Sequence, residues 1–284
     1  MKKTVKEVIK STFVYRFLLF IYVSIKALQQ VRVDIYSLRE LAAHIRGFPM
    51  LDKKIHRFLK NFADHVLNKD KRLIVVDIGA NDGWFAKSIF RFSPHAKVIS
   101  FEPLKSQQAK LALIKKQYPN FSCFSSAVGD KECSMTITEY KTSGLSSLRR
   151  INSAYSYFEG SGFSEEVVNE YRVDVVTLDK QLSEMLSEQD KVVLKIDTQG
   201  YELEVLKGAC ALMKRGAVKC ILIELMTIKK YAGMVLYNEI LEFLHERDFV
   251  LYDLCPFYYE KNNGRLSEID AIFMHQSILN EIEL

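Results

Sequence analysis

The sequence lacks the cysteine patterns that build disulfide frameworks or zinc sites. Its five cysteines are odd in number and scattered, and they form no CxxC pair and no Cys/His cluster at zinc spacing. This pattern favours a reducing compartment, and we expect a cytoplasmic protein. Internal repeats and low-complexity tracts are also lacking.

An apolar run long enough to span a membrane is lacking too. Residues 13–25, "FVYRFLLFIYVSI", hold 11 apolar residues in 13, whereas a span needs about 20. Four lysines precede the run as in a signal peptide, but no small-x-small cleavage site follows it. Two interpretations stay open. Either this helix is buried against the main domain or in a homodimer, or residues 1–30 contact anionic lipid at the inner face of the membrane.

Charge is distributed unevenly along the 284 residues. Residues 1–72 carry 16 Lys/Arg against 6 Asp/Glu, whereas the other 212 carry 24 against 29. Patterns such as "LRELAAHI" repeat apolar residues at helical spacing before residue 72. The chain is therefore predicted to have a basic helical region over residues 1–71 and a slightly acidic main domain over residues 72–284.

Short apolar stretches alternate with helical ones from residue 72 onward, which predicts an α/β fold with a mostly parallel sheet covered on both faces. Ligands of such sheets bind beyond the carboxyl ends of the strands. Residues 141–170 are rich in Ser and Gly and irregular. An insert of this length is expected to act as a lid over the substrate.

The stretch "VVDIGANDGW", residues 75–84, reads as a strand, a glycine turn and the start of a helix. Free N–H groups at that helix start would suit a carboxylate or phosphate. The GxGxxG fingerprint of dinucleotide sites is incomplete, and Asp82 places a negative charge where a pyrophosphate would bind. Glu102 ends the second predicted strand, where a carboxylate can accept both hydroxyls of a ribose. Together these motifs point to S-adenosylmethionine (SAM).

The stretch "VVLKIDTQGYELEVLKG", residues 192–208, places charges at the end of an apolar strand. An unpaired charge inside a buried strand is costly, so these groups either pair or handle a ligand. Lys195 and Asp197 share one strand face because side chains alternate with period two. Lys195 is then either an ion-pair partner or a group that orients the acceptor, and Tyr201 either packs or contacts the acceptor.

Six motifs in order resemble the FkbM-type methyltransferases: "VVDIGANDGW", "VISFEP", "SSAVGD", "VDVVTLD", "LKIDTQGYELEVLKGA" and "ILIEL". The resemblance covers roughly residues 72–275. It implies a Rossmann-like, seven-stranded, mostly parallel sheet of the class I methyltransferases, preceded here by the helical extension. It also implies methyl transfer from SAM to a hydroxyl of a sugar, glycan or other metabolite.

The resemblance also implies the roles of individual residues. The cofactor-binding set is Asp77, Gly79, Ala80, Asn81, Asp82, Gly83 and Trp84 at the methionine end, Glu102 and Pro103 at the ribose, Ser126 and Ala127 at the adenine with Asp130 nearby, and Asp197 near the sulfonium. A hydroxyl acceptor needs its proton removed, and the expected catalytic residues are Asp197, Glu202, Glu224 and Lys195. No metal ligand set is predicted, although Asp197 and Glu224 resemble the magnesium-binding acids of catechol-type enzymes.

Other interpretations are weighed against this one. The missing third glycine argues against a nicotinamide-dependent oxidoreductase. The acids Asp197, Glu202 and Glu224 argue against a non-catalytic cofactor-binding scaffold. The basic N-terminal region raises nucleic-acid methylation, but no aromatic-proline motif follows the fourth predicted strand. We therefore expect a small-molecule or glycan acceptor and no nucleic acid. His275 ends the last predicted strand and is considered as an alternative base.

Overall fold

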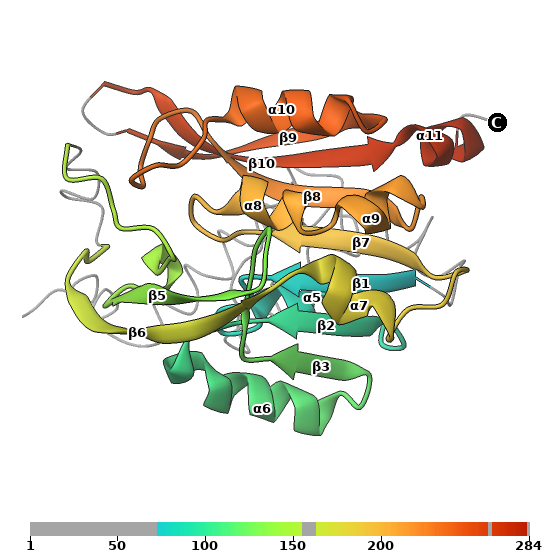
Figure 1. The fold of residues 1–284 in the computed structure, drawn as a ribbon, viewed down its shortest axis with the longest axis horizontal. Helices are drawn as coiled ribbons and strands as arrows, with labels where there is room; N and C mark the ends of the chain where they lie inside the picture. Colours follow the sequence, from blue (N-terminus) through green and yellow to red (C-terminus); the bar gives the residue numbers. More distant parts are fainter. Residues whose placement is uncertain (1–72, 155–162, 261–262, 283–284) are drawn as a thin grey trace, which may run out of the picture. The chain divides into compact units, whose positions relative to one another are not determined.

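The apolar runs of the sequence form the centre of a parallel sheet in the computed structural model of this chain (Figure 1). The structure describes residues 73–154, 163–260 and 263–282. Strands β1 (Leu73–Ile78) and β7 (Lys191–Ile196) are buried almost throughout, as expected when helices cover both faces. The predicted basic region 1–71 and residues 155–162 of the predicted insert lie outside the described residues.

The main sheet has seven strands in the order β3-β2-β1-β7-β8-β10-β9. The first five of these are parallel to their neighbours, whereas β10 is antiparallel to both β8 and β9. The predicted seven-stranded, mostly parallel sheet is thereby confirmed. The remaining five strands are β2 (Lys97–Phe101), β3 (Phe121–Phe124), β8 (Val218–Met226), β9 (Phe249–Tyr259) and β10 (Leu266–His275).

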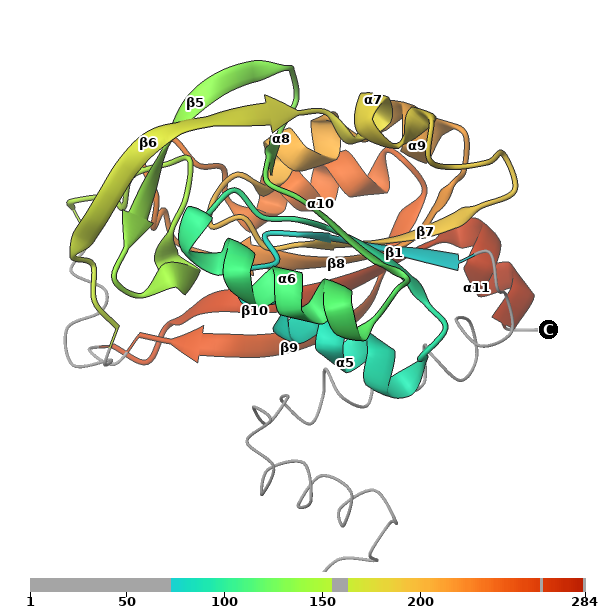
Figure 2. The ribbon, with the colours of Figure 1, turned by 90° about the horizontal axis from the view of Figure 1, so that it is seen from below.

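Helices cover both faces of this sheet (Figure 2). Helices α8, α9 and α10 lie on one face and α5 lies on the other, where it buries Phe85, Ile89 and Phe90. None of the helices that the structure describes is both long and apolar enough to cross a membrane. The α-helices are α5 (Trp84–Phe92), α6 (Gln108–Gln117), α7 (Leu178–Ser183), α8 (Glu202–Lys207), α9 (Cys210–Lys214), α10 (Tyr237–His245) and α11 (Gln276–Ile282).

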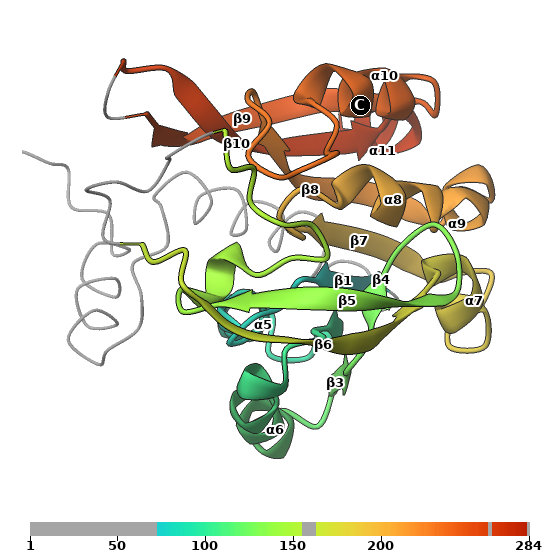
Figure 3. The ribbon, with the colours of Figure 1, turned by 60° about the vertical axis from the view of Figure 1, so that its left-hand side comes forward.

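A second, three-stranded sheet lies toward the carboxyl ends of the parallel strands (Figure 3). It consists of β4 (Ala127–Val128), β6 (Val167–Val176) and β5 (Cys133–Tyr140), with β6 in the middle. The predicted irregular insert is thus shorter than expected, because its last residues already pair in β6. Its described part begins with the short 3-10 helix η3 (Ser143–Leu145).

The antiparallel direction of β10 excludes His275 from the predicted site. Met274, its neighbour in β10, pairs with Cys220 near the start of β8, so His275 lies at the amino ends of the parallel strands. Its ring contacts Ser277 and the edge of Phe249. The interpretation of His275 as an alternative base is therefore wrong, because it assumed that the last strand ran parallel to the others.

Candidate functional site

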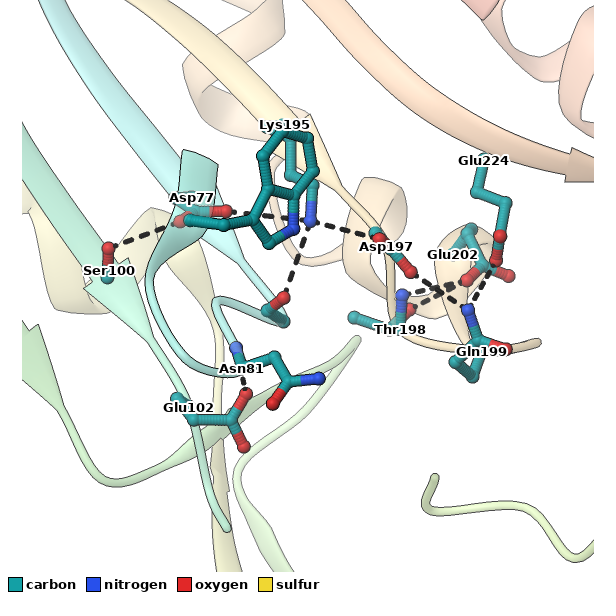
Figure 4. A network of polar contacts seen from close by, with 12 residues as sticks. Asp77, Asn81, Ser100, Glu102, Lys195, Asp197, Thr198, Gln199, Glu202 and Glu224 are labelled. Atoms are coloured by element: carbon teal, nitrogen blue, oxygen red, sulfur yellow. Dashed lines mark hydrogen bonds and ion pairs between the residues drawn. The ribbon is translucent and has the colours of Figure 1, made fainter. Parts of the chain in front are cut away.

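Lys195 in β7 and the carboxylates of Asp77 and Asp197 form a compact cluster beside the glycine loop, residues 79–84 (Figure 4). Lys195 Nζ donates to Asp197 Oδ2 at 3.1 Å and to the carbonyl of Gly79 at 3.3 Å, and it lies 3.7 Å from Asp77 Oδ1. Lys195 is 4% exposed and Asp77 is fully buried. Burial disfavours the Lys195 ammonium, but the two carboxylates outweigh this effect and raise its pKa. Lys195 is thus held as a cation between β1 and β7.

Asp77 lies in β1 and is fully buried. Burial raises the pKa of this carboxyl, while the nearby Lys195 ammonium opposes the change. Ser100 on β2 donates a 3.4 Å hydrogen bond to Oδ2, and Oδ1 accepts no hydrogen bond. In this structure the Asp77 carboxylate lies 3.7 Å from Lys195 Nζ, and its predicted contact with the methionine end of SAM stays a prediction.

Gly79 is placed where no side chain fits. Its φ is +79°, and a Cβ at this position would lie 1.8 Å from the carbonyl oxygen of Asp197. Most N–H groups of the loop that precedes α5 already have partners, on β2, on Glu102 or within the turn. The N–H groups of Gly79 and Ala80 both donate to Phe101 O, and the N–H of Asn81 donates to Glu102 Oε2. Within the turn, the N–H of Gly83 donates to Ala80 O and the N–H of Trp84 donates to Asp82 Oδ1.

Glu102 follows β2 and turns its carboxylate toward the loop. Its two oxygens accept the N–H groups of Asn81 at 2.6 Å and Leu104 at 2.7 Å. The side chain is buried, and this burial raises its pKa to about 7 despite the two N–H donors. A carboxylate has about four lone-pair positions, so each oxygen keeps capacity for one further donor, as a ribose with two hydroxyls requires.

Glu202, at the start of α8, holds the loop that follows β7. Its Oε1 accepts the N–H of Thr198 at 3.0 Å, the Thr198 hydroxyl at 3.1 Å and the N–H of Gly200 at 3.1 Å. Burial raises the pKa of Glu202 to about 7, although these N–H donors lower it. Oε1 of Glu202 thus shapes the backbone between β7 and α8.

Gln199 joins two of the predicted catalytic acids and was missed by the sequence reasoning. Its Nε2 donates to Asp197 Oδ1 at 3.0 Å and to Glu224 Oε2 at 2.8 Å. The Asp197 side chain is 33% exposed, whereas Glu224, in β8, is buried. Burial and nearby carboxylates raise the pKa of Glu224 well above its usual range. The only sequence signal for Gln199 is its place between a charged strand end and a glycine.

The insert after β5 contacts both loops of the site. The Ser143 hydroxyl donates to Asn81 Oδ1 at 3.0 Å, and the Ser147 hydroxyl donates to the carbonyl of Gln199 at 2.8 Å. Residues of η3 and the segment after it therefore lie over the carboxyl ends of β1 and β7, where a lid was predicted.

The other predicted residues surround this centre. Tyr201 is buried, contacts Met135 Sδ and lies under the Arg149 guanidinium, which is a packing environment. Ala127 begins β4 and is buried, and Asp130 is exposed. Half-buried positions that could contact a cofactor are Asn81, Asp82, Trp84, Pro103 and Ser126. In the part of the chain that the structure describes, no group of three His, Cys, Asp or Glu side chains is arranged to hold a metal ion.

A model of the "Methyltransferase FkbM domain" matches residues 77–251, more than half of the chain. The matched segment contains the glycine loop, Glu102 and the acids of β7 and β8. The chain belongs to the FkbM methyltransferase family. Membership of this family implies SAM as the methyl donor of this FkbM methyltransferase, and the carboxylate and loop described above fit its ribose and its amino-acid end.

Individual relatives of this FkbM methyltransferase are distant. The AMB antimetabolite synthetase AmbE of Pseudomonas aeruginosa is 28% identical over 182 residues, which are 52% of this chain but only 8% of that protein. A precorrin-6y C5,15-methyltransferase from Geobacter metallireducens matches 80% of this chain and 90% of its own, with 11% identity and a TM-score of 0.42. An rRNA methylase from Streptococcus thermophilus matches 80% and 99%, with 13% identity and a TM-score of 0.42.

Proposed function

We propose that this chain is an O-methyltransferase that transfers the methyl group of SAM to a hydroxyl of a sugar, a glycan or another small metabolite. The observation that carries the proposal is the pair of acids Asp197 and Glu224, joined by Gln199 at the carboxyl ends of β7 and β8. A hydroxyl acceptor must lose a proton during transfer, and this pair supplies carboxylates for that task beside the glycine loop.

Residues of the first two strands would hold the cofactor. Glu102 would accept the ribose hydroxyls, the loop from Gly79 to Trp84 would contact the methionine end, and Ser126 with Ala127 would border the adenine. SAM supplies an electrophilic methyl group on a cationic sulfur. Asp197, next to the loop and one-third exposed, provides a negative charge close to that cation, although its charge is shared with Lys195.

Glu224 is the better base of the two acids. Asp197 is already engaged by the Lys195 ammonium, which donates to it at 3.1 Å, whereas burial and neighbouring carboxylates raise the pKa of Glu224. A base with a raised pKa accepts a hydroxyl proton more readily. In this account Asp197 orients the acceptor, Lys195 fixes Asp197, and Glu202 shapes the loop that carries Gln199.

The test compares methyl transfer by the wild type and by Glu224→Gln, using radiolabelled SAM and a panel of sugars, glycans and hydroxylated metabolites. We expect kcat to fall about 100-fold or more in the variant, with SAM affinity kept. Glu139→Gln is the matched control, since Glu139 and Glu224 are both 7% exposed and Glu139 lies in β5. Transfer to amines but to no hydroxyl would contradict the proposal, as would full activity of Glu224→Gln.

A further inference from the structure

Gln199 contacts both acids of the proposed site. A side-chain amide has a single nitrogen with two N–H groups, and the 3.0 Å and 2.8 Å contacts to Asp197 and Glu224 use one each. Two carboxylates held this close repel one another when both are ionised. The amide places one donor on each of them and so bridges the two groups.

Tyr231 determines which way this amide faces. Its hydroxyl lies 2.8 Å from Gln199 Oε1 and 3.0 Å from the carbonyl of Leu145, so its one proton is shared between two acceptors. The Tyr231 side chain is 1% exposed. Because ionised carboxylates only accept hydrogen bonds, the Gln199 oxygen must point to the hydroxyl and its nitrogen to the acids. Leu145 belongs to η3, so the insert contributes to this arrangement.

The backbone at Gln199 is held in an unusual conformation. Its φ is +57°, in the left-handed region that residues other than glycine rarely adopt. Such a conformation persists where the surrounding structure fixes it, and it is common at functional sites. The next residue, Gly200, has φ +92° and packs so closely on Tyr231 that a Cβ would lie 3.0 Å from the Tyr231 Cβ. The chain therefore turns sharply here to present the amide.

We propose that Gln199, oriented by Tyr231, is a positioning residue that keeps Asp197 and Glu224 together as ionisable partners for the acceptor hydroxyl. This inference rests on the proposed function for the role of Glu224. The contacts of the Gln199 amide with the two carboxyl groups do not depend on which acceptor binds.

The surroundings of Glu224 predict the direction of the effect. The ionisable groups that act on it are Asp197 just after β7, Glu202 from α8, Glu268 and Asp270 from β10, and Tyr231 from the segment after β8. Burial and these acids favour its neutral form, and the Gln199 N–H group favours the charged form. Loss of that donor moves the ionisation of Glu224 to higher pH.

The experiment follows the Glu224 carboxyl by carbon-13 NMR titration of the full chain, with its signal assigned by its absence in Glu224→Gln. Gln199→Met keeps the length of the side chain and removes both donors, and we expect the Glu224 midpoint to rise by about one pH unit. Tyr231→Phe should raise it by less. Tyr140→Phe is the matched control, because the buried Tyr140 hydroxyl contacts the N–H of Ile151 in the insert but not Gln199.

An unchanged Glu224 midpoint in folded Gln199→Met overturns the proposal. If that variant does not fold, an unchanged midpoint in Tyr231→Phe overturns it instead, and a raised one supports it. With an acceptor in hand, the acidic limb of the pH–kcat profile should move by the same amount, while KM for SAM stays constant. A raised midpoint together with full activity of Glu224→Gln supports the positioning role and contradicts the proposed function, so the two fail separately.

Discussion

In the proposed cofactor site, Glu102 is the residue assigned to the ribose of SAM. Its carboxylate must be ionised to accept two ribose hydroxyls, but burial raises its pKa to about 7 in the free protein. Below pH 7 the Glu102 carboxyl is mostly protonated, so the binding of SAM must first remove this proton. The sequence singles out Glu102 by its position at the end of a strand, and its ribose role stays a prediction. Gln199 could not be predicted, since an amide becomes informative only when its two acidic neighbours are known.

We predict that the affinity for SAM falls as the pH drops below about 7, by up to tenfold per pH unit, and levels off above about 8. Calorimetry at pH 6, 7 and 8 measures this. Glu102→Gln should bind weakly with little pH dependence. Glu202→Gln is the matched control, because its pKa is also raised to about 7 but its carboxylate bonds only the loop after β7. A pH-independent affinity of the wild type would be incompatible with this role of Glu102.

At the scale of elements, the turn between β7 and α8 depends on a buried carboxyl. Glu202 holds Thr198 and Gly200, and in the folded protein it keeps its proton up to a pH of about 7. In the unfolded chain a glutamate loses its proton near pH 4.3. Between these values the folded state binds more protons than the unfolded state, so the free energy of unfolding falls as the pH rises.

We therefore predict that the cofactor-free protein is less stable at pH 7.5 than at pH 5.5, by about 1 kcal/mol or more. Glu202→Gln should reduce this difference in stability, because the amide has no proton to lose. The pKa of Glu102 is also raised to about 7, so Glu102 contributes to the difference that remains in the variant. Urea unfolding at the two pH values provides the comparison. An equal pH dependence of stability in the wild type and in Glu202→Gln would contradict this role of Glu202.

The sequence predicted elements well where the signal was local. Continuous apolar runs mark the buried parallel strands, and the order of strands and helices indicated the class of fold. Pairings between distant segments were missed: β6 pairs with β5 across the insert, and its first residues were assigned to that insert. The direction of β10 was missed as well, since an apolar strand reads the same in either direction, and His275 was misplaced as a result.

At the scale of the whole molecule, the basic region 1–71 lies outside the described residues, and its role stays a proposal. We propose that residues 1–30 bind anionic lipid, with each Lys or Arg near the surface contributing about 1 kcal/mol. The full chain should float with vesicles that contain phosphatidylserine at low salt, much less at high salt, and not with phosphatidylcholine alone. A chain that ignores anionic vesicles at low salt and sediments as a dimer would instead place the apolar run 13–25 in a subunit interface.

The central claim is that the carboxyl ends of β1 and β2 form a SAM site, and calorimetric titration of the full chain with SAM tests it most directly. We predict a dissociation constant in the micromolar range for the wild type. Gly79→Ala should abolish binding, because its Cβ would collide with the Asp197 carbonyl at 1.8 Å. Gly216→Ala should retain it: Gly216 has a similar φ of +70°, but no atom lies within 4 Å of its Cβ position. A folded wild type that gives no heat with SAM or with its demethylated product would contradict the account.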